Sequence, residues 1–402
     1  MRIVFLLTQD LESPSGLGRY WPIGKELTRL GHEITILALH SNYESLEEHE
    51  KDFIREGVHV RYVGQMHVRK VGSHKTYFSS IHLLQVALLG SLKLARAALQ
   101  APADAYHVGK PHPMNSLAGL LASRLRGRPL YLDCDDYESA SNRFGGTWQR
   151  WIVSLFENKM PQMSKRITTN TVFTVHRLSE LGVPKDRIVY VPNGVERSRF
   201  SHILDDDVEK LRGQLNLAGK KTILYLGSMS LANHAIDLLL EGFVVVREVE
   251  STAELLLVGG GEDYDALRAQ AKALGIEDAV HFTGRVLPSR APLYYALADV
   301  SVDPVRDDPA SRARHPLKLV ESLACGTPVV TGNVGDRSRI LGDASAGLVA
   351  APGDATSLAK AILRVLRDRK SAYERQCGDR DLDESLYWDQ LVKDFARAYA
   401  AP

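Results

Sequence analysis

Residues 315–330 read HPLKLVESLACGTPVV, which predicts a short helix, a glycine stop and then a strand. Proline is favoured at the first position of a helix, where Pro316 stands. Gly326 suits the left-handed conformation that commonly ends a helix. Between Pro316 and Gly326 most of the helix surface would be apolar, so we expect this helix to pack inward beside a buried strand.

Two charged residues interrupt this apolar helix. Lys318 falls in the first turn, where the helix dipole disfavours a cation, and Glu321 follows three residues later on the same face. A lysine beside the N–H groups of a helix start suits an anion, and a carboxylate one turn on could accept hydrogen bonds from sugar hydroxyls. The alternative is a buried helix whose Lys–Glu pair reaches out to solvent. The stretch alone does not decide between the two.

The composition is that of an ordinary soluble globular protein. The chain has 402 residues, 44% hydrophobic and 25% charged, and its net charge of +1 gives no reason to expect nucleic acid as a partner. The three cysteines, at 134, 325 and 377, are far apart and favour free thiols over a disulfide or zinc framework. The apolar run after Met1 is too short for a signal peptide. The sequence has no uninterrupted run of 18 apolar residues, so we expect no membrane span.

Short apolar runs alternate with helical patterns along the chain. The run at 3–7 leads into a loop with Gly16 and Gly18, then a helix to residue 30 and a second apolar run at 34–39. This order is typical of parallel strand–helix–strand units. The glycines would let backbone N–H groups approach a phosphate, although an ordinary turn explains them equally well. A second such series begins after residues 196–220, which are polar and predicted to be an irregular linker.

Polar residues gather at the ends of two predicted strands in the first half. One strand ends near His107, and the strand at 129–132 is followed by four carboxylates within residues 133–138. Loops at the carboxyl ends of parallel strands are where α/β proteins bind ligands. Asp135 and Asp136 could therefore act as an acid–base pair, hold sugar hydroxyls or bind a divalent metal. The alternative is a helix N-terminus that carries acidic residues.

The segment 66–100 joins a basic, aromatic stretch to a long amphipathic helix from about Ser80 to Gln100. Such a segment could lie on an anionic membrane surface. Leucine and alanine at helical spacing more commonly form a packed core, so a core helix with a solvated basic loop is the favoured interpretation. The basic stretch holds His67, Arg69, Lys70, His74 and Lys75, together with Tyr77 and Phe78.

The order and spacing of the motifs resemble those of the GT-B-fold glycosyltransferases of family four, a large retaining group that uses nucleotide-sugar donors. The resemblance covers nearly the whole chain. It rests on the segments 191–196, 257–262, 282–286 and 321–330, and on Gly227 at a strand end.

This resemblance implies two Rossmann-like α/β domains that face a central cleft. Residues 1–195 would form the acceptor-binding domain and residues 196–382 the domain that binds the nucleotide-sugar donor. A C-terminal helix within residues 383–402, which contain Tyr387 and Trp388 near their start, would cross back to the first domain.

The chain departs from the family pattern within the donor site. Glu321 matches the second family glutamate, which holds the ribose hydroxyls, but Ala313 stands where the first glutamate is expected. The arginine and lysine that usually neutralise the diphosphate are replaced by Ser228 and His234. The chain resembles a divergent sub-branch in which Lys318 makes up for the lost arginine.

The resemblance also implies a set of site residues. In the first domain Gly109 replaces the family histidine that meets the sugar, so Asp135 or Asp136 would contact the sugar or acceptor instead. The candidate catalytic residues are Asp135, Asp136, Lys318 and His107. The candidate donor-binding residues are Gly16, Gly18, Gly227, Ser228, His234, Gly260, Arg285, Val286, His315, Leu317, Lys318 and Glu321.

The activity expected from the resemblance is retaining transfer of a hexosyl unit from a UDP- or GDP-sugar to a saccharide or lipid-linked hydroxyl acceptor. The product would be a cell-surface polysaccharide or glycolipid. No metal and no cofactor besides the donor substrate are expected. The enzyme would be cytoplasmic, with peripheral contact to the inner face of the plasma membrane through residues 66–100. The alternative is a catalytically weak nucleotide-sugar-binding subunit that supports a partner enzyme.

Overall fold

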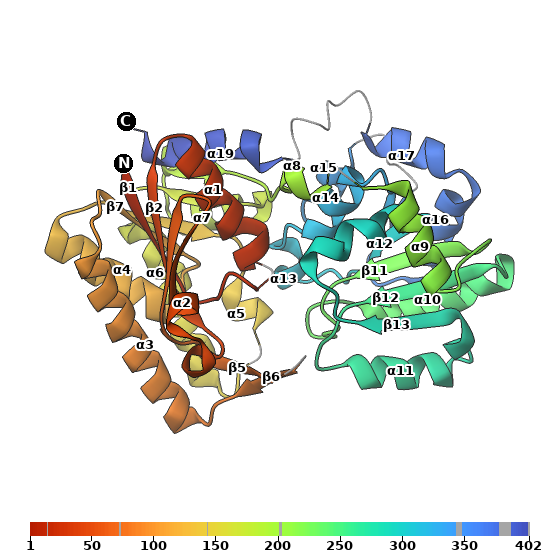
Figure 1. The fold of residues 1–402 in the computed structure, drawn as a ribbon, viewed down its shortest axis with the longest axis horizontal. Coiled ribbons are helices and arrows are strands. Elements are labelled where there is room, and N and C mark those ends of the chain that lie inside the picture. Colours follow the sequence, from red (N-terminus) through yellow and green to blue (C-terminus); the bar gives the residue numbers. More distant parts are fainter. Residues whose placement is uncertain are drawn as a thin grey trace. The chain divides into compact units, whose positions relative to one another are not determined.

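The computed structural model describes residues 1–13, 15–71, 74–142, 144–200, 203–342, 348–377 and 387–400, without the side chains of residues 71, 74, 75, 77 and 377. The chain divides into two compact units, each built on its own sheet (Figure 1). Unit 1 is Met1–Asn193 with Trp388–Pro402, and unit 2 is Gly194–Tyr387. The prediction of two Rossmann-like α/β domains is confirmed.

Unit 1 contains an eight-stranded sheet with the order β10-β9-β8-β7-β1-β2-β4-β3. All neighbours pair in parallel except β3, which is antiparallel to β4 at one edge. The basic stretch after residue 66 forms a separate antiparallel hairpin, β5–β6, and not the loop expected from its composition. The strands are β1 (Arg2–Leu7), β2 (Glu33–His40), β3 (Asp52–Arg55), β4 (Val58–Gln65), β5 (Val68–Val71), β6 (His74–Tyr77), β7 (Ala105–Gly109), β8 (Leu130–Cys134), β9 (Ile167–Thr169) and β10 (Ile188–Tyr190).

Helices cover both faces of this sheet. Successive side chains of a strand point to opposite faces, so Phe5 of β1 packs with α1 and α19, while Val4 and Leu6 pack with α3, α4, α6 and α7. The long helices are α1 (Trp21–Arg29), α3 (Ser80–Gln100), α4 (Pro113–Arg126), α6 (Thr147–Met163), α7 (Val172–Glu180) and α19 (Trp388–Ala396). Shorter ones are η1 (Gly16–Tyr20), η2 (Tyr43–Ser45), α2 (Glu48–Lys51), α5 (Glu138–Ser141), η3 (Lys185–Arg187) and η7 (Arg397–Tyr399).

The return of the C-terminal helix to unit 1 is also confirmed. The indole N–H of Trp388 donates to the carbonyl of Gly18 at 3.1 Å, and Phe395 lies in the same core cluster as β1. Trp388 is almost fully buried. The helix had been expected within residues 383–402, of which 383–386 lie outside the described residues.

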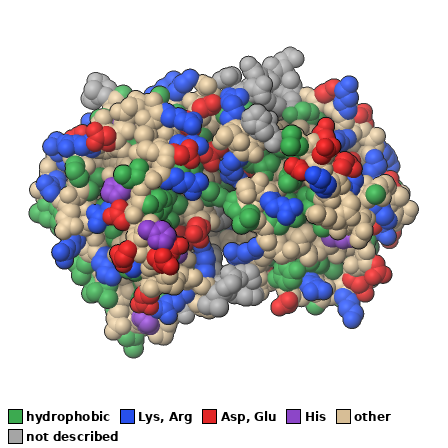
Figure 2. All heavy atoms as spheres, viewed as in Figure 1, with side chains coloured by type: hydrophobic (Ala, Val, Ile, Leu, Met, Phe, Trp, Pro, Cys, Tyr) green, Lys and Arg blue, Asp and Glu red, His purple; other side chains and the backbone are tan. Residues whose placement is uncertain are grey.

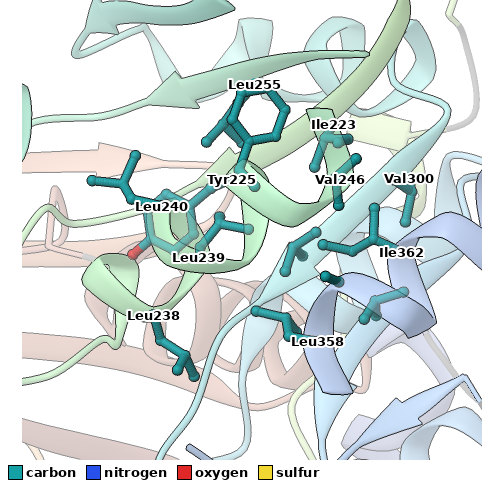
Figure 3. Close-up of a cluster of buried hydrophobic side chains, with 14 of the residues drawn as sticks. Ile223, Tyr225, Leu238, Leu239, Leu240, Val246, Leu255, Val300, Leu358 and Ile362 are labelled. Carbon is teal, nitrogen blue, oxygen red and sulfur yellow. The ribbon is translucent and has the colours of Figure 1, made fainter. Parts of the chain in front are cut away.

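Unit 2 contains a six-stranded parallel sheet with the order β13-β12-β11-β14-β15-β16. Figure 3 shows one of its two core clusters, where Ile223 and Tyr225 of β11 lie among side chains of α10 and α16. The strands are β11 (Lys221–Leu226), β12 (Ala253–Val258), β13 (Val280–Gly284), β14 (Val300–Asp303), β15 (Val329–Gly332) and β16 (Val349–Ala350).

The second core cluster of unit 2 lies on the opposite face of the sheet and contains α9, α12 and α14. The helices of unit 2 are α8 (Arg197–Phe200), α9 (Asp205–Gln214), α10 (Ile236–Val249), α11 (Tyr264–Ala273), η4 (Glu277–Ala279), η5 (Pro288–Arg290), α12 (Ala291–Leu297), α13 (Pro309–Arg312), α14 (Leu317–Ala324), α15 (Arg337–Leu341), α16 (Ala355–Arg367) and α17 (Arg369–Cys377).

Two local predictions need correction. Residues 196–220 are not irregular, because they hold α8 and α9, and Val208 and Leu211 of α9 are buried. Their acidic run forms the first turn of α9, where carboxylates are favourable. The loop at 13–20 is helical from Gly16, where an added Cβ would lie 2.1 Å from the carbonyl oxygen of Asp10. The glycine there permits a tight turn within unit 1.

Candidate functional site

Glycine-containing turns follow three neighbouring strands of unit 2 and meet at the carboxyl ends of those strands. The N–H of Gly227 donates to Val258 O at 2.9 Å, and the N–H of Met229 donates to Gly260 O at 3.1 Å. An added Cβ at Gly259, whose φ is +143°, would lie only 1.8 Å from the carbonyl oxygen of Gly227. Side chains are therefore excluded where these turns cross, and the predicted residues Gly227 and Gly260 lie side by side.

Helix α14 brings the side chain of Lys318 to the end of β11. The ammonium lies 3.2 Å from Asp303 Oδ1 and 4.3 Å from the centroid of the Tyr225 ring. It is also 3.5 Å from the position that a Cβ of Gly227 would take. Burial lowers the pKa of Lys318, and Asp303 opposes that effect. The structure thus places a desolvated cation beside the turn of Gly227 and Ser228.

Asp303, at the end of β14, holds this cation and was missed by the sequence analysis. Its other oxygen accepts from the guanidinium of Arg337 at 2.8 Å and from the hydroxyl of Thr331 at 3.1 Å. Burial acts to raise the pKa of Asp303, but Arg337 and Lys318 hold it below its usual range. Two cations share one carboxylate, so the cluster keeps a net positive charge that an anion could neutralise.

Glu321 lies one helical turn after Lys318 and is half-buried. The hydroxyl of Tyr295, from α12, donates to its Oε2 at 3.0 Å. Burial raises the pKa of Glu321, while Arg199 and the Tyr295 hydrogen bond act in the opposite direction. The carboxylate is thereby oriented by a neighbouring helix, which suits the predicted role of hydrogen-bond acceptor.

A small cavity of about 50 Å³ lies within unit 2 beside the Asp303 cluster. His234, Arg306, Arg314 and Arg337 line it, so three guanidinium groups surround the space. Arg314 is tied to the backbone of Asn233 by a hydrogen bond of 2.6 Å. Burial lowers the pKa of His234 well below its usual value, and nearby cations add to that effect. His234 thus lies near Lys318 as predicted, but as a neutral ring.

The remaining predicted donor residues are less closely grouped. Ser228 and Arg285 are exposed, and His315 is buried two residues before the start of α14. Val286 and Leu317 pack on a core cluster of unit 2. Arg285 and Val286 follow β13, which is two strands away from β11 in the sheet. In unit 1, Gly16 and Gly18 have packing explanations of their own, since Gly18 accepts the Trp388 hydrogen bond.

The structure does not support His107 as a catalytic residue. Its side chain is fully buried, and its ring stacks on Phe5 at 4.8 Å and on Phe395 at 5.3 Å between centroids. Its Nδ1 lies 2.6 Å from the hydroxyl of Tyr399. The strand continues two residues beyond His107 to Gly109, which leaves His107 beneath the returning C-terminal segment.

Replacement of His107 by phenylalanine is expected to reduce the acid sensitivity of unit 1. Burial lowers the pKa of His107 to about 4. Because the folded state favours neutral His107 over the charged form, this stabilisation is fully present above pH ~6.5, the pKa of an unfolded histidine. It is lost as the pH falls toward ~4, which lowers the free energy of unfolding by up to about 3 kcal/mol. Urea unfolding should therefore show a smaller loss between pH 7 and pH 4.5 in His107→Phe than in the parent chain.

Tryptophan fluorescence can follow this unfolding, because all four tryptophans belong to unit 1. The exposed His49 supplies the control variant His49→Phe, which should retain the parent's acid sensitivity. An unchanged pH dependence in His107→Phe would contradict the neutral, buried state of His107.

The acidic run after β8 divides into two groups with different partners. Asp133 is fully buried and belongs to the core, where it accepts two hydrogen bonds of 2.7 Å from Arg19. Tyr20 and Thr168 also donate to it. Arg19 in turn donates to Asn193, so the Arg19–Asp133 ion pair connects β8 to Asn193, the last residue of the first segment of unit 1. Asp133 is structural in this arrangement.

The other three carboxylates surround Lys110, a residue that the sequence analysis did not single out. Its ammonium lies 3.5 Å from Asp135, 2.6 Å from Asp136 and 3.0 Å from Glu138. Lys110 lies in the turn between β7 and α4. Its φ of +68° is uncommon for a residue other than glycine. These carboxylates lie close enough together to hold a metal ion, and the lysine ammonium already supplies a positive charge to all three.

Burial raises the pKa of Asp135 to about 8, while Lys110 opposes that effect. Burial thus favours the protonated form of Asp135, which can donate a hydrogen bond, and Asp136 is the candidate base of the pair. The structure brings Asp135 and Asp136 together at the end of β8, as predicted. A lysine directly after a strand, within Gly109-Lys110-Pro111, was the available sequence signal for the third member.

Two family models match successive parts of the chain. Residues 15–194 match the family described as "Glycosyl transferase 4-like domain", and residues 220–368 match "Glycosyl transferases group 1". The chain is 29% identical, over 57% of its length, to a GDP-mannose-dependent alpha-(1-6)-phosphatidylinositol monomannoside mannosyltransferase of Mycobacterium tuberculosis. It is 33% identical, over 38% of its length, to an alpha-monoglucosyldiacylglycerol synthase of Streptococcus pneumoniae.

The chain spans 60% of the mycobacterial protein and 34% of the streptococcal one. Among solved structures it is similar to HepE of Anabaena in complex with UDP-glucose, with a TM-score of 0.74 over 99% of both chains and 17% identity. That likeness establishes the fold.

Proposed function

We propose that this chain, a member of the GT-B-fold glycosyltransferases, transfers a hexosyl unit from a nucleotide-diphosphate sugar to a hydroxyl acceptor with retention at the anomeric carbon. The observation that carries the proposal is the buried Lys318 at the Gly227 turn, one helical turn before Glu321. In the reaction the bond from the anomeric carbon to the diphosphate breaks, and a bond to the acceptor oxygen forms as that hydroxyl gives up its proton.

Unit 2 is the proposed donor site. Glu321 would accept hydrogen bonds from the ribose hydroxyls, and the base would lie near residues 284–286. Lys318 and the first N–H groups of α14 would neutralise the diphosphate, because the start of a helix favours an anion. Stabilising the negative charge of this leaving group is the main catalytic contribution in the proposal. Lys318 thereby takes the role of the arginine that Ser228 replaces, as in the proposed divergent sub-branch.

Unit 1 is the proposed acceptor site, with the Lys110 cluster as its polar centre. Asp136 is the candidate base for the acceptor hydroxyl, and protonated Asp135 would donate to an acceptor oxygen. The proposal includes no metal ion and no cofactor besides the donor; Lys110 would supply positive charge in unit 1, and Lys318 and the start of α14 would supply it in unit 2.

The names of the relatives support the choice of substrate classes in this proposal. The mycobacterial relative is named for GDP-mannose and a phosphatidylinositol mannoside, the streptococcal one for a glucosyldiacylglycerol, and HepE was solved with UDP-glucose. A UDP- or GDP-hexose donor and a saccharide or lipid-linked acceptor are accordingly proposed. The product would belong to cell-surface polysaccharide or glycolipid, made on the cytoplasmic side of the membrane.

A second candidate function is a nucleotide-sugar-binding subunit with weak catalysis of its own. The buried Ala313 favours it, because the family glutamate expected there is absent. Both functions require donor binding, whereas only the transferase releases a nucleoside diphosphate when an acceptor is supplied.

A thermal-shift screen is the first test of donor binding. UDP, GDP, UDP-glucose or GDP-mannose at about 100 times Kd should raise Tm by ~2–4 °C, because a ligand of the folded state contributes about 2.7 kcal/mol at that concentration. Uridine and guanosine serve as controls and should give a smaller rise. If no nucleotide diphosphate or its sugar changes Tm, both candidate functions are contradicted. A binder with no turnover on lipid or saccharide acceptors would favour the second.

A further inference from the structure

The outer surface of three neighbouring helices in unit 1 is unusually apolar. Of the eighteen exposed large hydrophobic side chains in the described part of the chain, five lie on α3, three on α4 and four on α6. On α3, Leu84, Leu88 and Leu92 follow one another at four-residue spacing, as do Leu117, Leu121 and Leu125 on α4. This spacing places each set along one face of its helix.

These three faces form one surface. The inner sides of α3, α4 and α6 all pack on the same core cluster, on one side of the sheet. Helix α4 contacts α3 and α6, and Figure 1 shows α3 and α4 lying side by side. We define the outward sides of α3, α4 and α6 as the apolar layer. Because their inner sides are fixed by the core, the leucines of the apolar layer cannot turn inward without unfolding unit 1.

The charges of the apolar layer are of one sign. The only acidic residue on the three helices is Glu157, which is buried, although the whole chain has 49 acidic residues against 50 basic ones. Figure 2 shows acidic and basic side chains side by side over much of the visible face, in keeping with the nearly balanced charge of the whole chain. The basic residues, all exposed, are Lys93, Arg96, Arg124, Arg126, Arg150 and Lys159.

We propose that the apolar layer docks on an anionic lipid bilayer. Apolar side chains would enter the headgroup region while the surrounding lysines and arginines meet lipid phosphates. The exposed Trp148 and Trp151 suit the membrane–water interface, where tryptophan is enriched. A second copy of the chain is a poorer occupant, because it would bring the same cations face to face.

Helix α3 lies on the bilayer in this arrangement and does not cross it. It is the one helix of the described residues that is long and apolar enough to span a membrane by length and composition. Its buried residues, among them Val86, Gly90 and Leu94, are committed to unit 1. The favoured interpretation of a core helix is thus correct for its inner side only.

The docking needs no transferase activity, but it deepens the proposed function by one step. Helix α4 begins at Pro113, three residues after Lys110, so a helix of the apolar layer starts next to the loop that carries the lysine of the proposed acceptor cluster. An acceptor that is itself anchored in the bilayer fits this arrangement.

Vesicle flotation of the full chain tests the proposal. The protein should float with vesicles of equal parts phosphatidylglycerol and phosphatidylcholine, and much less with pure phosphatidylcholine or at high salt. The triple variant Leu88→Ser/Leu92→Ser/Leu121→Ser should bind at least ~10-fold more weakly. The matched control Ile54→Ser/Leu204→Ser/Leu287→Ser removes side chains that are more exposed but lie elsewhere, and it should float like the parent.

A second measurement uses the tryptophans. Trp21 and Trp388 are buried, so a blue shift of the fluorescence on adding anionic vesicles reports on Trp148 and Trp151 and should be absent in Trp148→Ser/Trp151→Ser. An absence of binding to anionic vesicles, or equal loss in the control variant, would overturn the proposal. The proposal would also be overturned if the protein formed a dimer that the apolar-layer variants disrupt and the control variant does not. Transfer of the sugar to a soluble acceptor should be unchanged in the triple variant. That measurement distinguishes a loss of membrane binding from a failure of the proposed transferase function.

Discussion

Substitution of Glu321 by glutamine is expected to lower kcat/KM for the donor roughly 100-fold while the fold stays intact. Two ribose hydroxyls donating to a carboxylate form charge-assisted hydrogen bonds, each contributing about 1.5 kcal/mol or more, and together about 3 kcal/mol. Glutamine keeps the size of the side chain and an oxygen for the Tyr295 hydroxyl at its present 3.0 Å. The measurement is the release of nucleoside diphosphate at low donor concentration, compared with the parent.

Two further variants give this prediction its controls. Tyr295→Phe removes only the hydroxyl that orients Glu321 and should cost much less than Glu321→Gln. Glu241→Gln neutralises an exposed carboxylate of α10 in the same unit and should leave kcat/KM unchanged. If Glu321→Gln reacts like the parent, or if its loss is matched by a loss of Tm in the absence of nucleotide, the carboxylate is not a ligand of the ribose.

The elements around Glu321 were predictable because their causes are local. The helix at 317–324 follows from its apolar spacing and from Gly326, whose φ of +72° is the left-handed stop expected from the sequence. The prediction erred by one residue, since Pro316 precedes the first helical position. The fold class follows in the same way, from apolar runs and helices that alternate over the whole chain.

The partners of the charged residues could not be predicted, because sheet order brings them together. Lys318 meets Asp303 because α14 packs against the end of β14, and both lie beside the Gly227 turn because β11 is the neighbour of β14, a relation that sequence spacing does not reveal. His107 and Asp133 look like site residues in sequence, since both lie near strand ends. The returning C-terminal segment and Arg19, both distant in the chain, bury them.

Replacement of Lys318 by methionine is expected to weaken the binding of UDP or GDP about 100-fold and to leave the binding of the nucleoside unchanged. The buried ammonium acts on the diphosphate, and a charge-assisted contact of this kind contributes about 1.5–3 kcal/mol. Methionine fills the space beside the Tyr225 ring without the charge. Calorimetric titration of each ligand into the folded variant measures the two affinities separately.

The competing explanation is that Lys318 only neutralises Asp303, and the structure shows how to separate the two roles. Asp303 keeps Arg337 at 2.8 Å when Lys318 is removed, so the carboxylate is not left without a cation and the variant should fold. A purely structural lysine predicts a lower Tm without nucleotide and the same ratio of diphosphate to nucleoside affinity as in the parent. Lys318→Arg restores the charge at this position and should recover part of the diphosphate affinity, whereas a structural role gives no reason for such a recovery. An equal weakening of nucleoside and diphosphate in Lys318→Met would place the phosphates elsewhere, and Arg314 at the neighbouring cavity would then be the next cation to test.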